Sequence, residues 1–398
     1  MNDDAMTTAE SLSPGTSSRR RELLKGLAAA GAVSAVFGRA LVALADEKAA
    51  VTDEMIRQAE WISGIALDDA QRKLMLDDVN ETLQGYAKSR AVVIDNGVAP
   101  ALMFDPSPFT APGVDRGRVI SPARPAPRVS GDDDTAFASV ADLGALLRAR
   151  KLSSVDLTKL YLARLDRYDP ILKVAITRTT DLALEQAAKA DRELSGGRDR
   201  GALHGIPWGV KDLFAVPGFP TTWGAEPYRD QVLKERATVV SRIDEAGGVL
   251  LAKTAVGALA WGDVWFGGMT RNPWKTEQGS SGSSAGSASG TAAGLFGFAI
   301  GTETLGSVVS PSTRCGTTGL RPTFGRVSRF GAMALSWSMD KVGVLARSAE
   351  DCALVFGAIH GADPLDAFAV TQPFSWPSPR AVRQLRVGYV KSLFDEDR

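Results

Sequence analysis

Two serines and one lysine stand in settings where they could carry out nucleophilic chemistry. Ser283 lies in the glycine-rich run SGSSAGS, and Ser307 ends the run GTETLGS. Glycine lets the backbone come close to a ligand and turn its N–H groups toward it. A serine hydroxyl attacks a carbonyl carbon effectively when a nearby base takes its proton. Lys211, which follows the apolar stretch IPWGV, is the candidate base. The three residues together predict a serine hydrolase.

Lysine is the candidate base because histidine, the usual proton shuttle, is scarce. The chain has two histidines, His204 and His360. His204 precedes the stretch that leads to Lys211 and could lie near the site, whereas His360 follows a helical apolar run and is expected at a helix end or on the surface. The sequence therefore disfavours a Ser-His-Asp triad. A lysine can take the role when burial lowers its pKa toward the working pH, and Lys211 stands where a buried strand would end.

The longer pattern around these residues resembles the amidase signature family of Ser-Ser-Lys amidohydrolases. That family reads roughly Gly-Gly-Ser-Ser-Gly-Gly, then an alanine-rich helix, then Gly-Thr-Asp-x-Gly-Gly-Ser. The resemblance also includes NPW at 272–274 and the pattern CGxxGLRPTxGRVS at 315–328, and it extends from about residue 137 onward. It implies that Ser307 is the nucleophile, Ser283 the bridging serine and Lys211 the base, with a cis peptide bond before Ser283.

The resemblance further implies how an amide would be cleaved. Ser307 would form an acyl-enzyme while the proton passes through Ser283 to neutral Lys211. The oxyanion would be held by backbone N–H groups, those of Thr304, Leu305, Gly306 and Ser307. The chain departs from the family pattern without losing a reacting group, through Glu303 for Asp, Leu305 for Gly, Val309 for Arg, and Ser281 and Ala285 for Gly. These departures predict an altered oxyanion loop and substrate pocket, because a leucine adds a Cβ where glycine had none.

The Ser/Gly run has two structural interpretations. Such runs are commonly flexible linkers. Here the run passes without a break into the apolar segment AAGLFGFAI, and its glycines recur every four residues, a spacing that lets a helix approach its neighbour closely. Glu303 and the Ser/Thr content leave no apolar stretch long enough for a membrane span. The pattern therefore favours a buried helix with a small-residue face.

The N-terminal segment, residues 1–45, resembles a twin-arginine export signal. RRRELLK at 19–25 precedes an apolar run at 26–37, and Ala43-Leu44-Ala45 offers a small-residue cleavage site before Asp46. This predicts a folded protein exported to the periplasm, with no membrane span left after cleavage. The alternative, an uncleaved membrane anchor, is disfavoured by the short apolar core and by Arg39.

Beyond the signal, the chain divides into a helical extension at 46–96, a proline-rich linker at 97–135 and an amidase signature domain at 136–398. In the extension, Thr52 opens one helical pattern, and Asp68 with Gln71 forms a capping box for a second. The domain alternates expected helices near 139–150, 154–167, 180–195 and 236–246 with expected strands near 172–177, 206–210, 248–252 and 297–301. Such alternation predicts an α/β layered fold with a mixed central sheet flanked by helices. The segment 385–391 also has the pattern of a strand.

Composition fits a globular enzyme that acts on a small amide. The 46 basic and 46 acidic residues cancel, so no nucleic-acid partner is predicted. The two cysteines, Cys315 and Cys352, are expected to pack as small hydrophobic side chains, with a single bridge between them left open. Neither a metal nor another cofactor is predicted. The sequence is compatible with a homo-oligomer. Two alternatives remain: the glutaminase subunit of a tRNA-dependent amidotransferase, and an inactive truncated remnant of the family.

Overall fold

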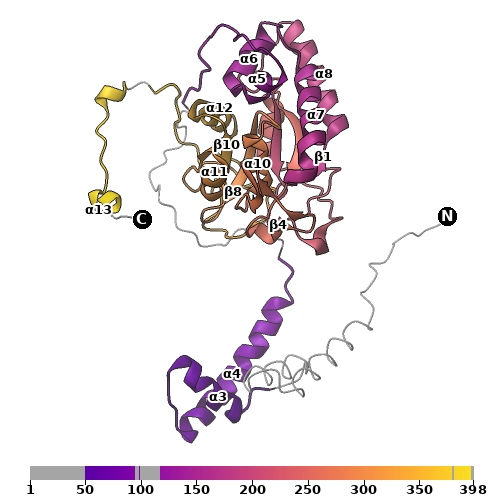
Figure 1. Ribbon diagram of the computed structural model, residues 1–398. Coiled ribbons are helices and arrows are strands. Elements are labelled where there is room, and N and C mark those ends of the chain that lie inside the picture. Colours follow the sequence, from indigo (N-terminus) through magenta and orange to yellow (C-terminus); the bar gives the residue numbers. More distant parts are fainter. Residues whose placement is uncertain (1–49, 95–97, 99–116, 379–380, 396–398) are drawn as a thin grey trace, which may run out of the picture. The chain divides into compact units, whose positions relative to one another are not determined.

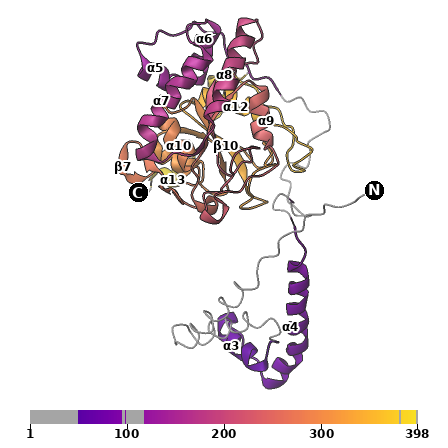
Figure 2. The ribbon, with the colours of Figure 1, turned by 90° about the vertical axis from the view of Figure 1, so that its right-hand side faces the viewer.

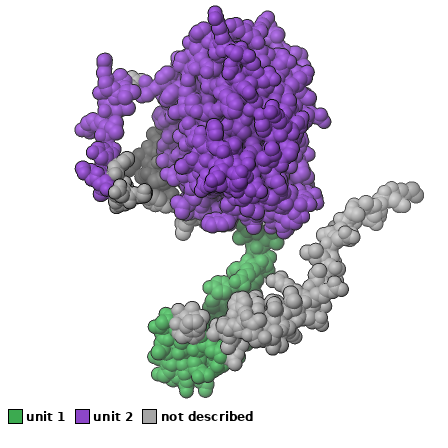
Figure 3. Space-filling model, in the orientation of Figure 1, with its two compact units in different colours: residues 1–94 green, residues 95–398 purple. Residues whose placement is uncertain are grey.

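The computed structural model describes residues 50–94, 98, 117–378 and 381–395 of the 398-residue chain. The chain divides into two compact units, residues 1–94 and residues 95–398, which are coloured separately in Figure 3. The predicted export signal at 1–45 lies outside the described residues. In the described part, no helix is both long enough and apolar enough to cross a membrane.

The first unit contains two helices, α3 (Asp53–Ser63) and α4 (Asp69–Arg90). The Thr52 side chain caps α3 by accepting a hydrogen bond from Met55 N, and the predicted capping box of Asp68 and Gln71 opens α4. Both features satisfy N–H groups that have no partner inside a helix. The two predicted helical patterns of the extension are therefore confirmed.

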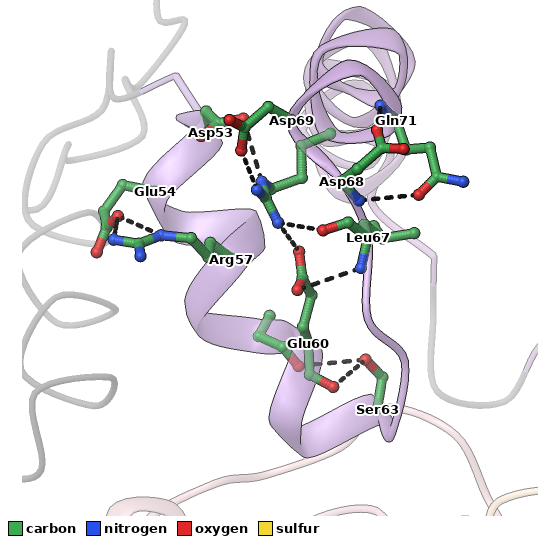
Figure 4. A network of polar contacts seen from close by, with 11 residues as sticks. Asp53, Glu54, Arg57, Glu60, Ser63, Leu67, Asp68, Asp69 and Gln71 are labelled. Atoms are coloured by element: carbon green, nitrogen blue, oxygen red, sulfur yellow. Dashed lines mark hydrogen bonds and ion pairs between the residues drawn. The ribbon is translucent and has the colours of Figure 1, made fainter.

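A buried arginine, Arg72, joins the two helices of the first unit. Its guanidinium donates to Glu60 Oε1 at 2.8 Å and to the Leu67 carbonyl at 2.6 Å, and it also pairs with Asp69. Figure 4 shows Glu60 and Leu67 facing each other across the turn between α3 and α4. Several charge-assisted bonds to one planar group stabilise this turn.

The second unit is built on a mixed six-stranded sheet (Figure 1). Its strands, in spatial order, are β1 (Ala175–Arg178), β3 (Val249–Thr254), β2 (Pro207–Lys211), β8 (Phe298–Glu303), β10 (Lys341–Ala346) and β9 (Thr318–Leu320). Strand β2 runs parallel to both of its neighbours, β3 and β8, and the other pairs are antiparallel. The predicted α/β fold with a mixed central sheet is confirmed.

Helices surround this sheet (Figures 1 and 2). They are α5 (Asp132–Phe137), α6 (Val140–Arg148), α7 (Ser154–Leu172), α8 (Thr180–Ser195), α9 (Thr238–Glu245), α10 (Ala285–Ala292), α11 (Val309–Cys315) and α12 (Ala349–Ile359). A further short helix, α13 (Lys391–Asp395), lies near the C-terminus. Two short hairpins, β4 (Val264–Trp265) with β5 (Gly268–Met269) and β6 (Arg271–Asn272) with β7 (Lys275–Gly279), complete the unit. The four predicted helices of the domain correspond to α6, α7, α8 and α9, and the four predicted strands to β1, β2, β3 and β8.

Strand β2 shows how the core divides between the two faces of the sheet. Trp208 stacks on Phe298 of β8, with ring centroids 5.9 Å apart, and lies beside Gly248 at the end of the α9 segment. Because side chains alternate along a strand, Gly209 and Lys211 point to the other face. On that face Gly209 lies against Phe296, the ring that Gly290 of α10 also approaches. Lys211 therefore points toward the α10 side of the sheet.

Residues 117–135, which fall within the predicted proline-rich linker, form hydrogen bonds and ion pairs with other parts of the second unit. Arg118 and Ile120 exchange backbone hydrogen bonds with Trp376, and Arg124 pairs with Glu350 at 2.5 Å. Helix α5 already begins at Asp132, where three successive aspartates favour the positive end of the helix dipole.

The predicted strand at 385–391 is wrong. Residues 385–390 are irregular, and Lys391 begins the short helix α13. Val387 is 88% exposed and Tyr389 is 70% exposed. A strand needs a neighbouring strand for its backbone N–H and C=O groups. In the described part of the chain, the central sheet ends at β1 and β9, and neither pairs with this segment.

Candidate active site

Lys211, Ser283 and Thr302 meet at the carboxyl ends of two parallel strands. Lys211 is the last residue of β2, Thr302 lies near the end of β8, and Ser283 is in the turn that leads into α10. The Lys211 amine donates to Ser283 Oγ at 2.9 Å, to Thr302 Oγ1 at 2.8 Å and to the Thr302 carbonyl at 3.3 Å. The structure thus brings together the predicted base and the predicted bridging serine.

The environment of Lys211 suits a base that works without histidine. Its side chain is fully buried, and its three hydrogen-bond partners are neutral groups. Burial lowers the pKa of Lys211 to about 7, although the negative charges of Asp340 and Glu303 oppose this shift. A neutral amine is therefore abundant near neutral pH, as proton acceptance requires.

The backbone that carries Ser283 is shaped by small residues. The peptide bond between Gly282 and Ser283 is cis, as the resemblance implied. A Cβ on Gly282 would lie 1.8 Å from the Gly262 carbonyl oxygen, so this position has no room for a side chain. Ser281 has a φ of 60°, and its N–H donates to Asp263 Oδ2 at 2.8 Å. The loop that contains Gly262 and Asp263 therefore holds the turn before Ser283.

Helix α10 is buried along its whole length, so the linker interpretation of the Ser/Gly run is wrong. A Cβ on Gly286 would lie 2.2 Å from the Val174 carbonyl oxygen, and one on Gly290 would lie 2.4 Å from the Phe296 ring. The four-residue glycine spacing thus lets the helix approach the chain beside it, as predicted. This close approach places Ser283 against the end of β2.

Ser307 is the last residue of a short irregular loop, residues 304–307, that follows β8. Its carbonyl accepts a hydrogen bond from Ser284 N at 3.1 Å, which ties it to the turn that contains Ser283. In the described structure no hydrogen bond joins the side chains of Ser283 and Ser307. Gly306 has a φ of 93°, a conformation that favours glycine, and Leu305 is 83% exposed. The extra Cβ of Leu305 therefore points away from the packed interior.

Glu303, the residue that replaces the usual aspartate, is fully buried and holds the far end of this loop. Its Oε2 accepts from Val308 N at 2.8 Å and Val309 N at 2.9 Å, and its Oε1 pairs with Arg321 at 3.0 Å. Burial alone would raise the pKa of Glu303. Hydrogen bonds from backbone N–H groups and from Arg321 outweigh that effect and hold the pKa below its usual value. The ionised carboxylate thus anchors the residues that follow Ser307.

The two histidines lie elsewhere. His204 is buried before β2, where its Nδ1 accepts from Arg200 N at 3.1 Å and its Nε2 lies 3.2 Å from Glu193 Oε2. The five-residue strand β2 separates it from Lys211, so the expectation that His204 lies near the site is wrong. His360 caps the end of α12, as predicted, but is buried and stacks on Phe356 rather than facing solvent.

Three residues that contact the site were not identified from the sequence. Thr302 binds the Lys211 amine, Asp340 accepts from Thr304 Oγ1 at 2.5 Å, and Lys341 donates to the Thr304 carbonyl at 2.9 Å. Thr302 could have been found as a polar residue that follows the apolar residues FAIG in the same strand. Asp340 and Lys341 carry no comparable signal, because only the pairing of β10 with β8 brings them to the loop.

A cavity of about 930 Å³ borders the site. Thr302, Asp340 and Lys341 form part of its wall, and Trp223 and Trp337 form another part.

The two cysteines lie outside this chemistry. Cys315 and Cys352 are both free and buried, and burial raises the pKa of each thiol to about 12. They pack as small hydrophobic side chains and form no bridge. Among the described residues, no group of three metal-ligating side chains is arranged to hold a metal ion.

The chain belongs to the Amidase family. The sequence model of that family, described as Amidase, matches residues 156–397, which include Lys211, Ser283 and Ser307.

Curated relatives include A-type subunits of glutamyl-tRNA(Gln) amidotransferase. The protein from Marinomonas sp. (strain MWYL1) is 42% identical over 266 residues, which cover 65% of this chain and 54% of the relative. The protein from Methylococcus capsulatus is 41% identical with the same coverage. The chain thus spans about half the length of the curated relatives it matches.

Solved structures of amidases have the same fold. The native peptide amidase from Stenotrophomonas maltophilia is 40% identical, with a TM-score of 0.56 over 62% of this chain and 51% of that chain. A bacterial aryl acylamidase of the amidase signature family is 28% identical, with a TM-score of 0.56 over 60% of this chain and 50% of that chain.

Proposed function

We propose that the protein is an amidohydrolase that cleaves a carboxamide C–N bond through an acyl-enzyme on Ser307. The observation that supports this most directly is the buried amine of Lys211, 2.9 Å from Ser283 Oγ and with a pKa of about 7. A buried lysine bonded to a serine that lies beside a second, partly exposed serine is suited to moving a proton and little else.

The proposed first step is acylation. Neutral Lys211 accepts the proton of Ser283, Ser283 accepts that of Ser307, and Ser307 Oγ forms a bond to the amide carbon. The carbonyl oxygen becomes an oxyanion, held by backbone N–H groups of residues 304–307. The hydrogen bond between Lys211 and Ser283 supports the first leg of this relay. The second leg requires the hydroxyls of Ser307 and Ser283 to come within hydrogen-bond distance of each other. Donors of this kind contribute about 3–4 kcal/mol each to transition-state stabilisation.

The remaining steps return the enzyme to its starting state. The proton on Lys211 passes back through Ser283 to the amine as the C–N bond breaks. Water then attacks the acyl-enzyme, with Ser283 and Lys211 again accepting the proton, and the carboxylic acid leaves while Ser307 recovers its hydrogen. The relay uses side chains of this chain alone. We propose a small-molecule amide as substrate and the cavity beside Thr302 as the space into which it extends.

A second function, the glutaminase subunit of a tRNA-dependent amidotransferase, is favoured by one observation. The curated relatives at 41–42% identity belong to amidotransferases of this kind. The balanced charge of the chain and the predicted export signal favour a stand-alone amidase instead. The two functions differ in substrate: a glutaminase would release ammonia from glutamine and respond to partner proteins, whereas the amidase would hydrolyse other carboxamides unaided.

The test is covalent labelling with a fluorophosphonate, which reacts with activated serine hydroxyls. We expect peptide mapping of the full-length protein to place the adduct on Ser307 and Ser307→Ala to abolish it. Ser310→Ala is the matched control, because Ser310 is an exposed serine three residues along and should leave labelling unchanged. An adduct on another serine would overturn the assignment of Ser307. Absence of any adduct in the folded protein would favour the inactive remnant.

A further inference from the structure

Asp340 bonds to the loop that carries the proposed nucleophile. Its Oδ1 accepts from Thr304 Oγ1 at 2.5 Å, while its Oδ2 accepts from Leu335 N at 2.8 Å and Ser336 N at 3.0 Å. The residue is 8% exposed. One carboxylate therefore joins the 304–307 loop to the chain segment that leads into β10.

The pairing of two strands explains why Asp340 reaches this loop. Lys341 of β10 lies opposite Glu303 of β8 in the antiparallel ladder. One step further along the ladder, Asp340 comes opposite Thr304, where directly facing side chains interact. Lys341 contacts the same residue and donates to the Thr304 carbonyl at 2.9 Å. Thr304 is thus held through both its hydroxyl and its carbonyl.

Asp340 also contributes negative charge to the surroundings of Lys211. Burial lowers the pKa of that lysine, and Asp340, followed by Glu303, opposes the shift.

The other charged groups nearby are paired differently. Asp212, next in the chain after Lys211, pairs with Lys253 at 2.7 Å, Glu303 pairs with Arg321, and the Lys341 amine bonds the Thr304 carbonyl. The hydrogen bonds that Asp340 accepts come from neutral hydroxyl and N–H groups. Its negative charge acts on the Lys211 amine and also on that of Lys341.

Building on the serine–lysine function proposed above, we propose that Asp340 is a positioning residue that acts on both halves of the site. It holds the oxyanion loop through Thr304, and it sets the electrostatic environment of the Lys211 amine. Two substitutions test these roles separately. Thr304→Val removes only the hydrogen bond from the Thr304 hydroxyl, whereas Asp340→Asn removes the negative charge and keeps the shape of the side chain.

The first test measures the charge role without needing activity. The pKa of Lys211 is followed by NMR of the full-length protein with ¹³Cε-labelled lysine, with the Lys211 signal assigned by its loss in Lys211→Met. Removing a neighbouring negative charge destabilises the ammonium form, so we expect Asp340→Asn to lower the pKa of Lys211 by about 1 unit. Thr304→Val should leave that pKa unchanged.

Asp363→Asn is the matched control. Asp363 is similarly buried and accepts from Ser328 Oγ and Thr238 Oγ1, but it does not contribute to the Lys211 environment. If Asp340→Asn unfolds the protein while Asp363→Asn does not, Asp340→Ser replaces it, since a hydroxyl keeps an acceptor for a loop N–H group. An unchanged Lys211 pKa in the folded Asp340 variant, or an equal shift in Asp363→Asn, would overturn the charge role.

The second test measures the loop role through the rate of Ser307 labelling. At a pH where Lys211 is neutral in every variant, we expect Thr304→Val to slow fluorophosphonate labelling about 10-fold, less than the loss of a direct oxyanion donor. Thr304→Ser, which keeps the hydroxyl, should label at nearly the wild-type rate. Equal rates for Thr304→Val and wild type would overturn the loop role. If the wild-type protein itself does not label, the proposed function fails, and the NMR titration still decides the charge role.

Discussion

At the scale of single residues, the central feature is a lysine buried among neutral groups. The Lys211 amine bonds two hydroxyls and a carbonyl, which do not replace the hydration that an ammonium loses on burial. Lys253 in the neighbouring strand is equally buried, but its charge is matched by Asp212 at 2.7 Å. Burial lowers the pKa of both lysines, and that of Lys211 lies at about 7. What distinguishes Lys211 is its partner, because its amine bonds the hydroxyl of Ser283 rather than a carboxylate.

Replacement of Lys211 by alanine should remove activity. Because general-base groups contribute about 10²- to 10⁴-fold, we expect the rate of Ser307 acylation in Lys211→Ala to fall at least 10²-fold. In the wild-type protein, the rate should rise with pH through about 7 and level off above it, since the neutral amine is the active form. His204→Ala should retain most of the activity and the same pH profile. Stopped-flow acylation across pH measures both, and loss of acylation in His204→Ala with retention in Lys211→Ala would contradict the proposed relay.

At the scale of elements, helix α10 depends on glycine where it packs against the neighbouring chain. Gly286 faces the Val174 carbonyl and the Ala255 N–H, with room for hydrogen but not for a methyl group. Ser287 Oγ donates to the Ile300 carbonyl of β8, so the helix is also tied to the sheet by its serines. A sequence of small residues is therefore what allows the turn at Ser283 to reach the end of β2.

Gly286→Ala should destabilise the second unit even though alanine is the better helix former. A Cβ would lie 2.2 Å from a backbone oxygen, and such overpacking costs about 1–3 kcal/mol. Gly85→Ala is the matched control, because Gly85 lies inside helix α4 with nothing within 4 Å of the added Cβ. It should stabilise the first unit by up to about 1 kcal/mol. Urea unfolding of both variants tests this, and equal effects would show that helix propensity outweighs the close contact.

At the scale of the whole molecule, the site lowers the stability of the fold at neutral pH. The pKa of Lys211 falls from 10.5 to about 7 on folding, so between these values the unfolded chain binds more protons than the folded one. The free energy of unfolding therefore rises with pH across this window. Each pKa unit corresponds to about 1.4 kcal/mol.

Lys211→Met should consequently be more stable than the wild type at pH 7, while it is inactive. The difference in free energy of unfolding should shrink as the pH approaches 10. Lys159→Met, at an exposed position of α7, should show no such trend. Urea unfolding at pH 7 and pH 10 gives the comparison. A Lys211→Met variant that is less stable at both values would mean that the hydrogen bonds of the lysine outweigh its burial.

The predicted export signal is also tested on the whole chain. The twin arginines at positions 20 and 21 and the small residues at 43–45 predict a mature protein that begins at Asp46 and is recovered from the periplasm. Changing both arginines to lysine should leave the precursor in the cytoplasm, whereas Arg39→Lys, outside the pair, should not. Cell fractionation with N-terminal sequencing decides between the outcomes. Periplasmic recovery of the double variant would contradict a twin-arginine signal.

The sequence by itself determined the candidate catalytic residues and most of the elements that carry them. Ser283, Ser307 and Lys211 were identified because their motifs are local and glycine-rich. Helices α6 to α9 were identified because helical periodicity acts over a few neighbouring residues, with side-chain N-caps at α6 and α7. Tertiary structure decided the rest. Asp340 reaches Thr304 only through the pairing of β10 with β8, and His204 is separated from the site by the length of β2. The strand predicted at 385–391 is absent because strand formation depends on a distant partner, which local pattern does not encode.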